Sequence, residues 1–439
     1  MNTALLARMS LLNVMKQGRK SLGTLLVIAV SVMAFCLLAG YMQANVSLIE
    51  NAFMRWGARG HLILERPTSS LAHKVEGAGQ DPIEADMQAR LDDLLAADPA
   101  VVTRARILRI SGMVANAEVS TIFAGIGQDV QQIRTIKGPA YEYDVVAGAP
   151  LWKETGGDGL VLGQGLAAIL GCDVPDVGFA PVQPGQTPES RPLICPPGPL
   201  ELTVSTRGTA RVNVALSKPT GIMDWGIKEV NDRLVVMPLA AAQALLNTSE
   251  VSQYHVLLEP GADLDAAKGR LEEAMREAGL DITVFRWSDR AAFYQQVKAV
   301  LSGFLNFIAV VAAIVGFTSL LNSSYMSYMN RAREFATLRS VGFSRRFVIM
   351  LTAMESAWLA GGATTLGVAA AAAVTWLIQA AKIMWTPPGS SNAVPVEVAW
   401  VPLAYLVSFL LVVGLAALAS FLPIRKILIR PIRAVLAEA

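Results

Sequence analysis

The sequence predicts a membrane protein with four transmembrane α-helices and a large mixed α/β extracytoplasmic domain inserted between helices 1 and 2. Three observations lead to this fold class. Hydrophobic residues make up 53% of the 439-residue chain and charged residues only 16%, whereas a soluble globular protein carries about 25% charged residues. Four apolar stretches are long enough to cross a bilayer, and basic residues gather in the short segments beside them. The net charge of +2 is too close to neutral to indicate a nucleic-acid partner.

Transmembrane helices are expected at residues 22–41, 299–321, 349–381 and 401–422. Each stretch reaches the roughly 20 residues that a helix needs to cross a hydrocarbon core of about 30 Å. The third stretch exceeds one span, so we expect it to tilt or to extend beyond the bilayer. None of the four contains Lys, Arg or Asp, and Glu355 in the third stretch is the one acidic residue among them.

The first span has an alternative interpretation as a cleaved signal peptide, because a basic start precedes an apolar core. That core is longer than the usual 7–15 residues, and no small-x-small cleavage site follows it. We therefore expect an uncleaved anchor. Residues 1–21 before it form an amphipathic basic segment that is suited to the cytosolic interface.

The distribution of basic residues predicts the orientation of the spans. Residues 330–348 carry five arginines against Glu334, whereas residues 382–400 carry one Lys and one Glu. Short segments rich in Lys and Arg stay in the cytosol. The chain is therefore expected to be a multi-pass membrane protein with both termini cytosolic and residues 42–298 outside the cytosol. Further basic residues agree with this orientation: Arg8, Lys16, Arg19 and Lys20 before the first span, and Arg425, Lys426, Arg430 and Arg433 in the cytosolic tail, residues 423–439.

Residues 42–298 alternate between strand and helix patterns, which predicts a mixed α/β domain. Strand patterns cover residues 61–65, 101–118, 121–126, 159–162, 200–216, 234–238, 253–258 and 282–287. Helix patterns cover residues 83–97, 164–170, 240–246 and 264–278.

A proline-rich insertion at residues 172–199 interrupts this alternation, because its prolines exclude a continuous helix or a central strand. Cys172 and Cys195 bracket the insertion and are the only cysteines in the outer block, residues 42–298. Their position in an oxidising compartment favours a disulfide; the alternative is two unpaired, buried thiols. Cys36 lies in the first span and is expected to serve packing.

The sequence contains no set of residues that predicts a catalytic, cofactor or metal site. Residues 163–168 have the form G-x-G-x-x-A after a strand, but a proline-rich loop stands where a dinucleotide fold needs its next strand. We interpret this segment as a tight strand-to-helix turn. The histidines His61, His73 and His255 lack metal-ligand spacing. Neither a phosphate loop nor a nucleophile elbow is present, so we expect no enzyme activity in this chain.

Glu355 is a candidate functional residue, because ionisable groups in spanning helices are rare. It lies close to the basic segment, so we expect an ion pair with Arg345 or Arg346, or a helix–helix hydrogen bond, rather than a proton-relay role. Gly361, Gly362 and Gly367 in the same helix are expected to permit close helix packing.

Residues 330–348 are patterned as a short amphipathic helix between two spans. Phe335, Leu338 and Val341 recur at three-residue spacing. A small basic helix at the cytosolic side of a membrane is expected to contact a cytosolic partner. The interleaved cations are Arg331, Arg333, Arg339, Arg345 and Arg346.

Residues 333–346, REFATLRSVGFSRR, resemble the R-E-I-A-x-L-R-A-x-G-A-S-R-R segment of FtsX-like ABC transporter permeases. Glu355 and the glycine-rich run after it resemble the following span of that family. Residues 423–436 resemble its P-x-R-x-A…x-P-I-x-A-L ending. The outer block resembles the MacB-type periplasmic core domain, through V-L-G-x-x-L-A-x-x-L-G at residues 161–171 and a strand before a helix at residues 236–239. The insertion at 172–199 is longer than the family's turn.

The resemblance implies a permease of the bacterial inner membrane, with residues 42–298 in the periplasm. It would work as a dimer of two copies or two paralogues, around ATPase subunits that bind ATP and Mg. No ATPase domain is fused to the chain, so a separate cytosolic ATPase is expected. Movements of the periplasmic domains would act on an amphiphilic cargo such as a lipoprotein, lipid, peptide or drug, with membrane lipid and a periplasmic adaptor or carrier as further partners. The expected ATPase-coupling residues are Arg333, Glu334, Phe335, Leu338, Arg339, Val341, Gly342, Arg345 and Arg346.

Two other functions compete with this interpretation. A membrane-anchored regulator or scaffold would control a cell-wall enzyme through its outer domain without transporting anything. A membrane-anchored enzyme is disfavoured, because an anchor needs one span rather than four.

Overall fold

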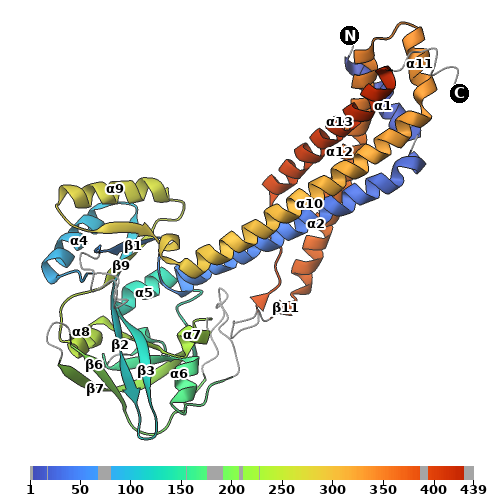
Figure 1. Cartoon of the computed structure of the whole chain (residues 1–439). Coiled ribbons are helices and arrows are strands. Elements are labelled where there is room, and N and C mark those ends of the chain that lie inside the picture. Colours follow the sequence, from blue (N-terminus) through green and yellow to red (C-terminus); the bar gives the residue numbers. More distant parts are fainter. Residues whose placement is uncertain are drawn as a thin grey trace. The chain divides into compact units, whose positions relative to one another are not determined.

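The computed structural model describes residues 3–16, 18–67, 81–154, 156–175, 191–206, 211–226, 228–385 and 394–429 (Figure 1). The chain divides into two compact units. The helical unit comprises residues 1–47, 297–383 and 395–439, and the α/β unit comprises residues 48–296 and 384–394. His73 and Arg430 to Leu436, on which part of the sequence analysis rests, lie outside the described residues.

The helical unit is built from long apolar helices that run side by side (Figure 1). Within the described ranges, four helices are long and apolar enough to cross a membrane, at Leu22–Trp56, Tyr294–Asn330, Arg345–Ala381 and Pro402–Lys426. The helices of this unit are α1 (Thr3–Lys16), α2 (Gly18–Asn51), α10 (Ala292–Asn330), α11 (Ala332–Ser340), α12 (Arg345–Ala381) and α13 (Pro402–Ile429), of which α2 and α10 continue into the α/β unit.

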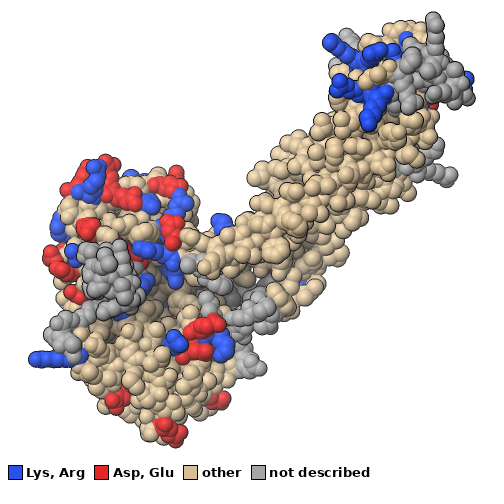
Figure 2. All heavy atoms as spheres, in the orientation of Figure 1, with Lys and Arg blue, Asp and Glu red and all other residues tan. Residues whose placement is uncertain are grey.

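Charge is distributed unevenly over the helical unit. Figure 2 shows few charged side chains along its shaft, whereas Lys and Arg gather at the end that holds α11. Helices α1 and α11 and the end of α13 lie together at that end (Figure 1). The apolar shaft and the basic end agree with a membrane span and its cytosolic flank.

The α/β unit contains a ten-stranded sheet in the order β10-β1-β9-β2-β3-β8-β5-β7-β4, with β6 between β2 and β7. The strands are β1 (Leu62–Glu65), β2 (Val101–Ala115), β3 (Ser120–Gln128), β4 (Val145–Gly148), β5 (Gly159–Gly163), β6 (Leu200–Ser205), β7 (Val212–Met223), β8 (Leu234–Pro238), β9 (Gln253–Leu258) and β10 (Thr283–Arg286). The helices are η1 (Ala52–Trp56), α4 (Ala85–Ala97), α5 (Val130–Lys137), η2 (Leu151–Lys153), α6 (Gln164–Ile169), α7 (Lys228–Asn231), α8 (Leu239–Leu246), α9 (Leu264–Glu277) and η3 (Trp287–Arg290). A separate two-stranded sheet joins β11 (Met384–Trp385) to β12 (Val394–Pro395).

Six of these strands close into a ring. The pairs β2–β3, β3–β8, β8–β5, β5–β7, β7–β6 and β6–β2 follow one another until the first strand is reached again. The inside of the ring contains buried aliphatic side chains such as Leu108, Leu162, Leu202 and Val235. Closure leaves the ring without an exposed edge, and the sheet extends from β2 through β9 and β1 to β10.

Two of the predicted strands differ from the strands in the structure. The pattern at 101–118 stops at Ala115, because the Asn116 side chain accepts hydrogen bonds from the backbone N–H groups of Glu118 and Val119 and forms a turn. The pattern at 200–216 falls into the two antiparallel strands β6 and β7. Helix α5 had no counterpart in the sequence analysis.

Candidate functional site

The segment expected to contact a partner folds into α11 and a turn that leads into α12. Gly342 follows α11 with φ of 105°, a backbone conformation that glycine adopts without the steric cost of a Cβ. Ser344 then caps α12, because its Oγ accepts a hydrogen bond from the Phe347 N–H at 3.2 Å. The two helices are therefore joined by a tight turn with its own local hydrogen bonds.

One side of α11 belongs to the interior of the helical unit. Phe335 is only 1% exposed, and its ring meets Tyr328 of α10 edge-on with centroids 6.0 Å apart. Leu338 packs against the same cluster. The other buried members of the cluster are Leu6 of α1, Phe347, Val348 and Leu351 of α12, and Ile424 and Leu428 of α13.

The prediction that Phe335 supplies contact area to a partner is therefore wrong. The three-residue spacing identified an apolar side of α11, but that side is covered by α1, α10, α12 and α13 of the same chain. Arg339 is also tied to the chain, because its guanidinium donates to the Leu428 carbonyl at 3.1 Å. These two residues hold α11 in place.

A second set of residues from the same segment is exposed. Val341 is 73% exposed and Phe343 41% exposed, although both are apolar. Phe343 lies against Phe347 with ring centroids 4.6 Å apart, which fixes its position beside the turn. Arg333, Arg345 and Arg346 are exposed around them, as is Glu334. We call Arg333, Val341, Phe343, Arg345 and Arg346 the docking surface. Sequence reasoning had missed Phe343, although the aromatic beside an arginine pair was visible.

Glu355 forms a buried polar cluster with two residues from other helices. Its Oε2 accepts from Arg331 Nη1 at 2.7 Å, and its Oε1 accepts from Asn13 Nδ2 of α1 at 2.7 Å. Arg331 also pairs with Glu334 at 2.9 Å. The expected pairing of Glu355 with Arg345 or Arg346 is wrong, because those arginines are exposed. The expected helix–helix hydrogen bond is present, from Asn13 of α1 to Glu355 of α12. The cluster instead joins α1, the start of α11 and α12.

A small polar cavity of about 50 Å³ lies beside Glu355. Ser323, Ser324, Ser327 and Tyr328 of α10 line it together with Ser356 of α12. The Tyr328 hydroxyl lies 3.1 Å from Ser356 Oγ. A cavity of this size accommodates one or two water molecules, which would hydrate the polar cluster.

The three glycines of α12 differ in their surroundings. A Cβ at Gly367 would lie 2.5 Å from the Ala29 carbonyl of α2, so this glycine lets the two helices approach closely. A Cβ at Gly361 would be in ordinary contact with Phe409. A Cβ at Gly362 would meet no atom of another described segment within 4 Å, so the packing role expected for this glycine is wrong among the described residues.

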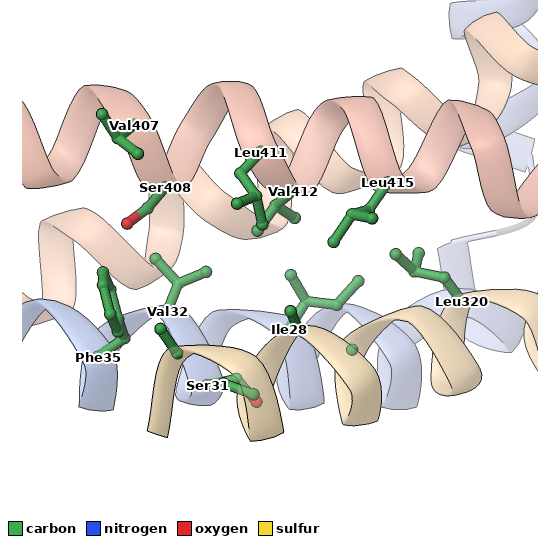
Figure 3. Close-up of a pocket in the computed structure, with 14 residues that line it drawn as sticks. Ile28, Ser31, Val32, Phe35, Leu320, Val407, Ser408, Leu411, Val412 and Leu415 are labelled. Atoms are coloured by element: carbon green, nitrogen blue, oxygen red, sulfur yellow. The ribbon is translucent and has the colours of Figure 1, made fainter. Parts of the chain in front are cut away.

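A larger apolar cavity of about 100 Å³ lies between α2, α10 and α13 (Figure 3). Ile28 and Val32 of α2, Leu320 of α10 and Leu411 of α13 line it. Cys36 is buried near this region in the packing between helices. The cavity is too small for an amphiphile, so we assign no cargo to it.

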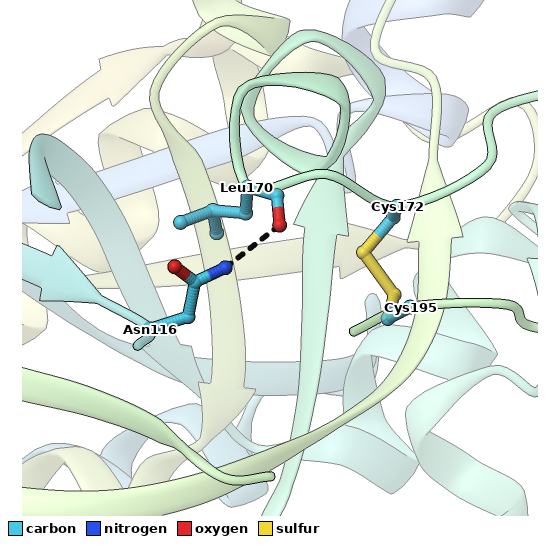
Figure 4. The surroundings of a disulfide bond; sticks show 4 residues. All are labelled: Asn116, Leu170, Cys172 and Cys195. Carbon is cyan, nitrogen blue, oxygen red and sulfur yellow. Dashed lines mark hydrogen bonds between the residues drawn. A yellow bond between two sulfur atoms is a disulfide. The ribbon is translucent and has the colours of Figure 1, made fainter. Parts of the chain in front are cut away.

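Cys172 and Cys195 are joined by a disulfide in the α/β unit (Figure 4). The backbone beside it is paired as well, because Asp173 N–H donates to the Ile194 carbonyl at 2.8 Å. Asn116 Nδ2 donates to the Leu170 carbonyl at 2.8 Å and holds the end of α6. The bond therefore closes the base of the proline-rich insertion, of which residues 176–190 lie outside the described residues.

The G-x-G-x-x-A segment is a packing turn. A Cβ at Gly163 would lie 2.4 Å from the Asn231 carbonyl, and one at Gly165 would lie 2.0 Å from Asp232 Oδ1. The α7 region thus fills the space in front of the turn, where a dinucleotide phosphate would have to bind. Over the described ranges, no three His, Cys, Asp or Glu residues form a group that could hold a metal ion.

The outside of the β-ring carries an exposed apolar face. On β7, Val212, Val214 and Leu216 are 68%, 50% and 66% exposed, whereas the Asn213 side chain between them turns inward and donates to the Leu245 carbonyl of α8. Met113 of β2 and Ile122 of β3 are opposite each other in register and are 50% and 54% exposed. We call these five aliphatic residues the apolar ring face. The usual alternation is inverted here, because the apolar positions of β7 face outward.

Two family models match the chain. Residues 21–274 match the MacB-like periplasmic core domain, and residues 306–432 match the FtsX-like permease C-terminal model. A curated relative, the macrolide export ATP-binding/permease protein MacB of Bdellovibrio bacteriovorus, is 23% identical over 178 residues. The match covers 38% of this chain and 27% of that protein. None of these matches favours the alternative of a cell-wall regulator.

Two solved structures are similar to the chain over about half of its length. The extracellular domain of the noncanonic ABC-type transporter YknZ from Gram-positive bacteria aligns with a TM-score of 0.33 and 11% identity, over 51% of this chain and 98% of that one. The periplasmic region of MacB from Actinobacillus actinomycetemcomitans aligns with a TM-score of 0.34 and 9% identity, over 54% of this chain and 92% of that one.

Proposed function

Because this chain belongs to the family of FtsX-like ABC transporter permeases with a MacB-like periplasmic core domain, we propose that it couples ATP hydrolysis in a separate ATPase subunit to movements of its periplasmic domain. ATP and Mg would be bound by the partner.

The proposed orientation is supported by the distribution of charge. The α11 end of the helical unit exposes Arg333, Arg345 and Arg346, and the sequence beside the other helix ends at that side is also basic. We propose four spans with both termini cytosolic in the bacterial inner membrane, and with the α/β unit placed in the periplasm between the first and second spans.

The observation that carries the coupling proposal is the two-sided environment of α11. Phe335 and Arg339 anchor the helix in the bundle, while Val341 and Phe343 expose apolar area in an arginine-rich surrounding. An interface with an apolar centre and a charged rim is typical of protein–protein recognition. A push on this surface would reach the spans through Phe335 and through the polar cluster around Glu355.

Two paired substitutions test the coupling surface. In Val341→Asp with Phe343→Asp, two charges replace the apolar centre, so we expect an ABC ATPase subunit co-expressed with the permease to lose co-purification and permease-dependent ATP hydrolysis. The matched control, Ile122→Asp with Leu216→Asp, makes the same change on the apolar ring face and should retain both. Undiminished association of the first variant would exclude this surface as the coupling site.

The cargo class is inferred from the apolar ring face. Five exposed aliphatic side chains on an outer domain are a feature of interaction sites rather than of an inert surface. We propose that this face contacts the apolar part of an amphiphilic cargo, such as a lipoprotein, lipid, peptide or drug. The Ile122→Asp, Leu216→Asp variant should bind a fluorescent diacyl lipopeptide more weakly than the wild type, and unchanged binding would argue against a cargo role.

Further partners follow from the exposed apolar side chains of the spans. Phe307, Val310 and Ile314 of α10 are 66%, 57% and 58% exposed in the single chain. We propose that membrane lipid and a second permease, either a copy or a paralogue, cover this helix, and that a periplasmic adaptor or carrier meets the α/β unit. Cross-linking between cysteines introduced at Phe307 of co-expressed chains would detect the permease–permease contact.

A further inference from the structure

Three arginines converge on one face of the α/β unit, next to the segments that connect it to α2 and α10. Arg59 follows η1, Arg290 ends η3 just before α10, and Arg109 lies on β2. Arg59 Nη1 donates to the Arg290 carbonyl at 3.3 Å. Arg109 interacts electrostatically with both of the other guanidinium groups. The chain thus brings together three like charges that repel one another.

The strand register explains this convergence. In the β1–β9–β2 part of the sheet, Ile63 pairs with His255, which pairs with Ala105. Side chains at every second position share a face, so Glu65 and Gln253, two residues from this row, and Arg109, four residues from it, lie on the same side. On the opposite side, β1 and β9 contribute apolar side chains to the core, and Arg104 and Arg106 of β2 are paired with Asp92 and Asp129. Arg109 reaches Gln253 Oε1 at 2.9 Å, and Arg290 Nη2 reaches Glu65 Oε2 at 2.7 Å.

The charges of this face are not balanced by the described residues. Glu65 is the carboxylate that pairs with the cluster, and it is 1% exposed. The described hydrogen-bond acceptors of Arg59 and Arg109 are neutral oxygens. Burial lowers the pKa of His255 to about 3 and also lowers the pKa of His61, so both imidazoles are neutral at pH 7. Three arginines against one glutamate leave two positive charges uncompensated.

The cluster is accessible to a ligand. Arg109 is exposed, and the Arg290 side chain is 40% exposed. Arg59 is half-buried and rests on the Phe53 ring at 5.0 Å. The guanidinium groups are therefore held in place by stacking and by neutral acceptors, while donor groups remain available to an anion.

The sequence places this cluster close to the membrane surface. The helix that holds the first span continues to Trp56, three residues before Arg59, and the helix that holds the second begins at Tyr294, four residues after Arg290. The second expected span starts at residue 299, and α10 covers the chain from Ala292 to that point. Arg290 therefore lies at most about 18 Å from the hydrocarbon core, which has a headgroup layer about 5–7 Å deep on each side. Translocated flanks usually avoid arginine, so a positive cluster there indicates an anionic partner.

We propose that Arg59, Arg109 and Arg290 bind the phosphate of an anionic amphiphile in the outer leaflet of the membrane. Guanidinium groups recognise phosphate through paired, charge-assisted hydrogen bonds. The inference rests on the proposed function, because it uses the orientation that places the α/β unit in the periplasm. It deepens that function by assigning a phosphate headgroup to the amphiphile, in addition to the apolar part that the ring face contacts.

Binding of phosphatidylglycerol to the purified full-length chain tests the proposal, with phosphatidylcholine and inorganic phosphate as further probes. Arg59→Gln with Arg109→Gln should weaken phosphatidylglycerol binding at least about tenfold, since hydrogen bonds to charged groups are lost. Arg104→Gln with Arg270→Gln removes the same charge from surface pairs with Asp92 and Asp98 and should bind like the wild type. Glu65→Gln removes the negative charge from the cluster and should strengthen binding, an effect that misfolding does not produce.

Three results would overturn the proposal. The first is equal phosphatidylglycerol binding by the Arg59→Gln, Arg109→Gln variant and its control. The second is equal binding of phosphatidylcholine by the wild type. The third is full displacement of the lipid by inorganic phosphate at equal concentration, which would indicate a site for the free ion. The outcome is separable from the coupling proposal, because the arginine variant should keep its association with the ATPase, whereas the Val341→Asp, Phe343→Asp variant should keep its lipid binding.

Discussion

Replacing Phe335 by alanine separates a structural role of α11 from a contact role. The side chain is 1% exposed, so the substitution removes a fully buried ring and leaves a cavity between α10, α11 and α12. Buried Phe→Ala changes cost about 3–5 kcal/mol. The edge-on contact with Tyr328 contributes about 0.5–1.5 kcal/mol of this figure. Val341→Ala, at a side chain that is 73% exposed, should stay within about 0.5 kcal/mol.

Thermal unfolding of the purified full-length chain in detergent measures this difference. We expect a clear fall in the melting temperature for Phe335→Ala and almost none for Val341→Ala. Below the melting temperature of both variants, Val341→Ala should weaken association with the ATPase more than Phe335→Ala does. A Phe335→Ala variant with wild-type stability and lost ATPase association would refute the assignment of Phe335 to the interior.

Three further predictions concern the buried polar cluster, the disulfide and a buried histidine. Glu355→Ala leaves Arg331 without its buried partner and should cost about 3–5 kcal/mol of stability, whereas replacing both Arg331 and Glu355 by Met should recover most of this loss. Thermal unfolding measures both variants, and equal losses would contradict the pairing. Replacing Cys172 and Cys195 by Ser opens a loop with a sequence separation of 23 residues and should cost about 3 kcal/mol, and reductant should lower the melting temperature of the wild type but not of this variant. In the folded state His255 has a pKa of about 3, below its usual 6.5, so the unfolded state binds more protons and stability should fall as the pH drops from about 6.5 to 3. His255→Gln should flatten this part of the stability–pH profile, and an unchanged profile would contradict the assignment of a neutral imidazole.

The assignment as a membrane permease with a MacB-like periplasmic domain was accessible from the sequence, because it depends on composition and on periodic patterns. The four apolar stretches needed only their length, and the two family regions were recognisable from short motifs. The family assignment is confirmed by the matches to both family models.

The orientation of individual faces was not accessible. The spacing of Phe335, Leu338 and Val341 shows that α11 is amphipathic, but it does not show whether its apolar side meets this chain or another. Val212 and Leu216 on β7 have an alternation that normally marks a buried face, and here it marks an exposed one. A local pattern specifies a face, whereas the rest of the fold decides what covers it.

Partners that are distant in sequence were missed for the same reason. Glu355 was expected to pair with Arg345 or Arg346, which are close to it along the helix. Its actual partners are Asn13 of α1 and Arg331, which lies between α10 and α11, and tertiary packing brings both to it. The arginine cluster of the α/β unit likewise depends on the register of β1, β9 and β2.

The most direct test of the coupling surface is site-specific photo-cross-linking in native membranes. A photoreactive residue at Val341 should cross-link to a protein that carries a phosphate-loop ATPase sequence, identified by mass spectrometry, and the same residue at Met113 on the apolar ring face should not. Absence of an ATPase cross-link from Val341, or an equal yield from Met113, would contradict the claim that the turn between α11 and α12 contacts the ATPase.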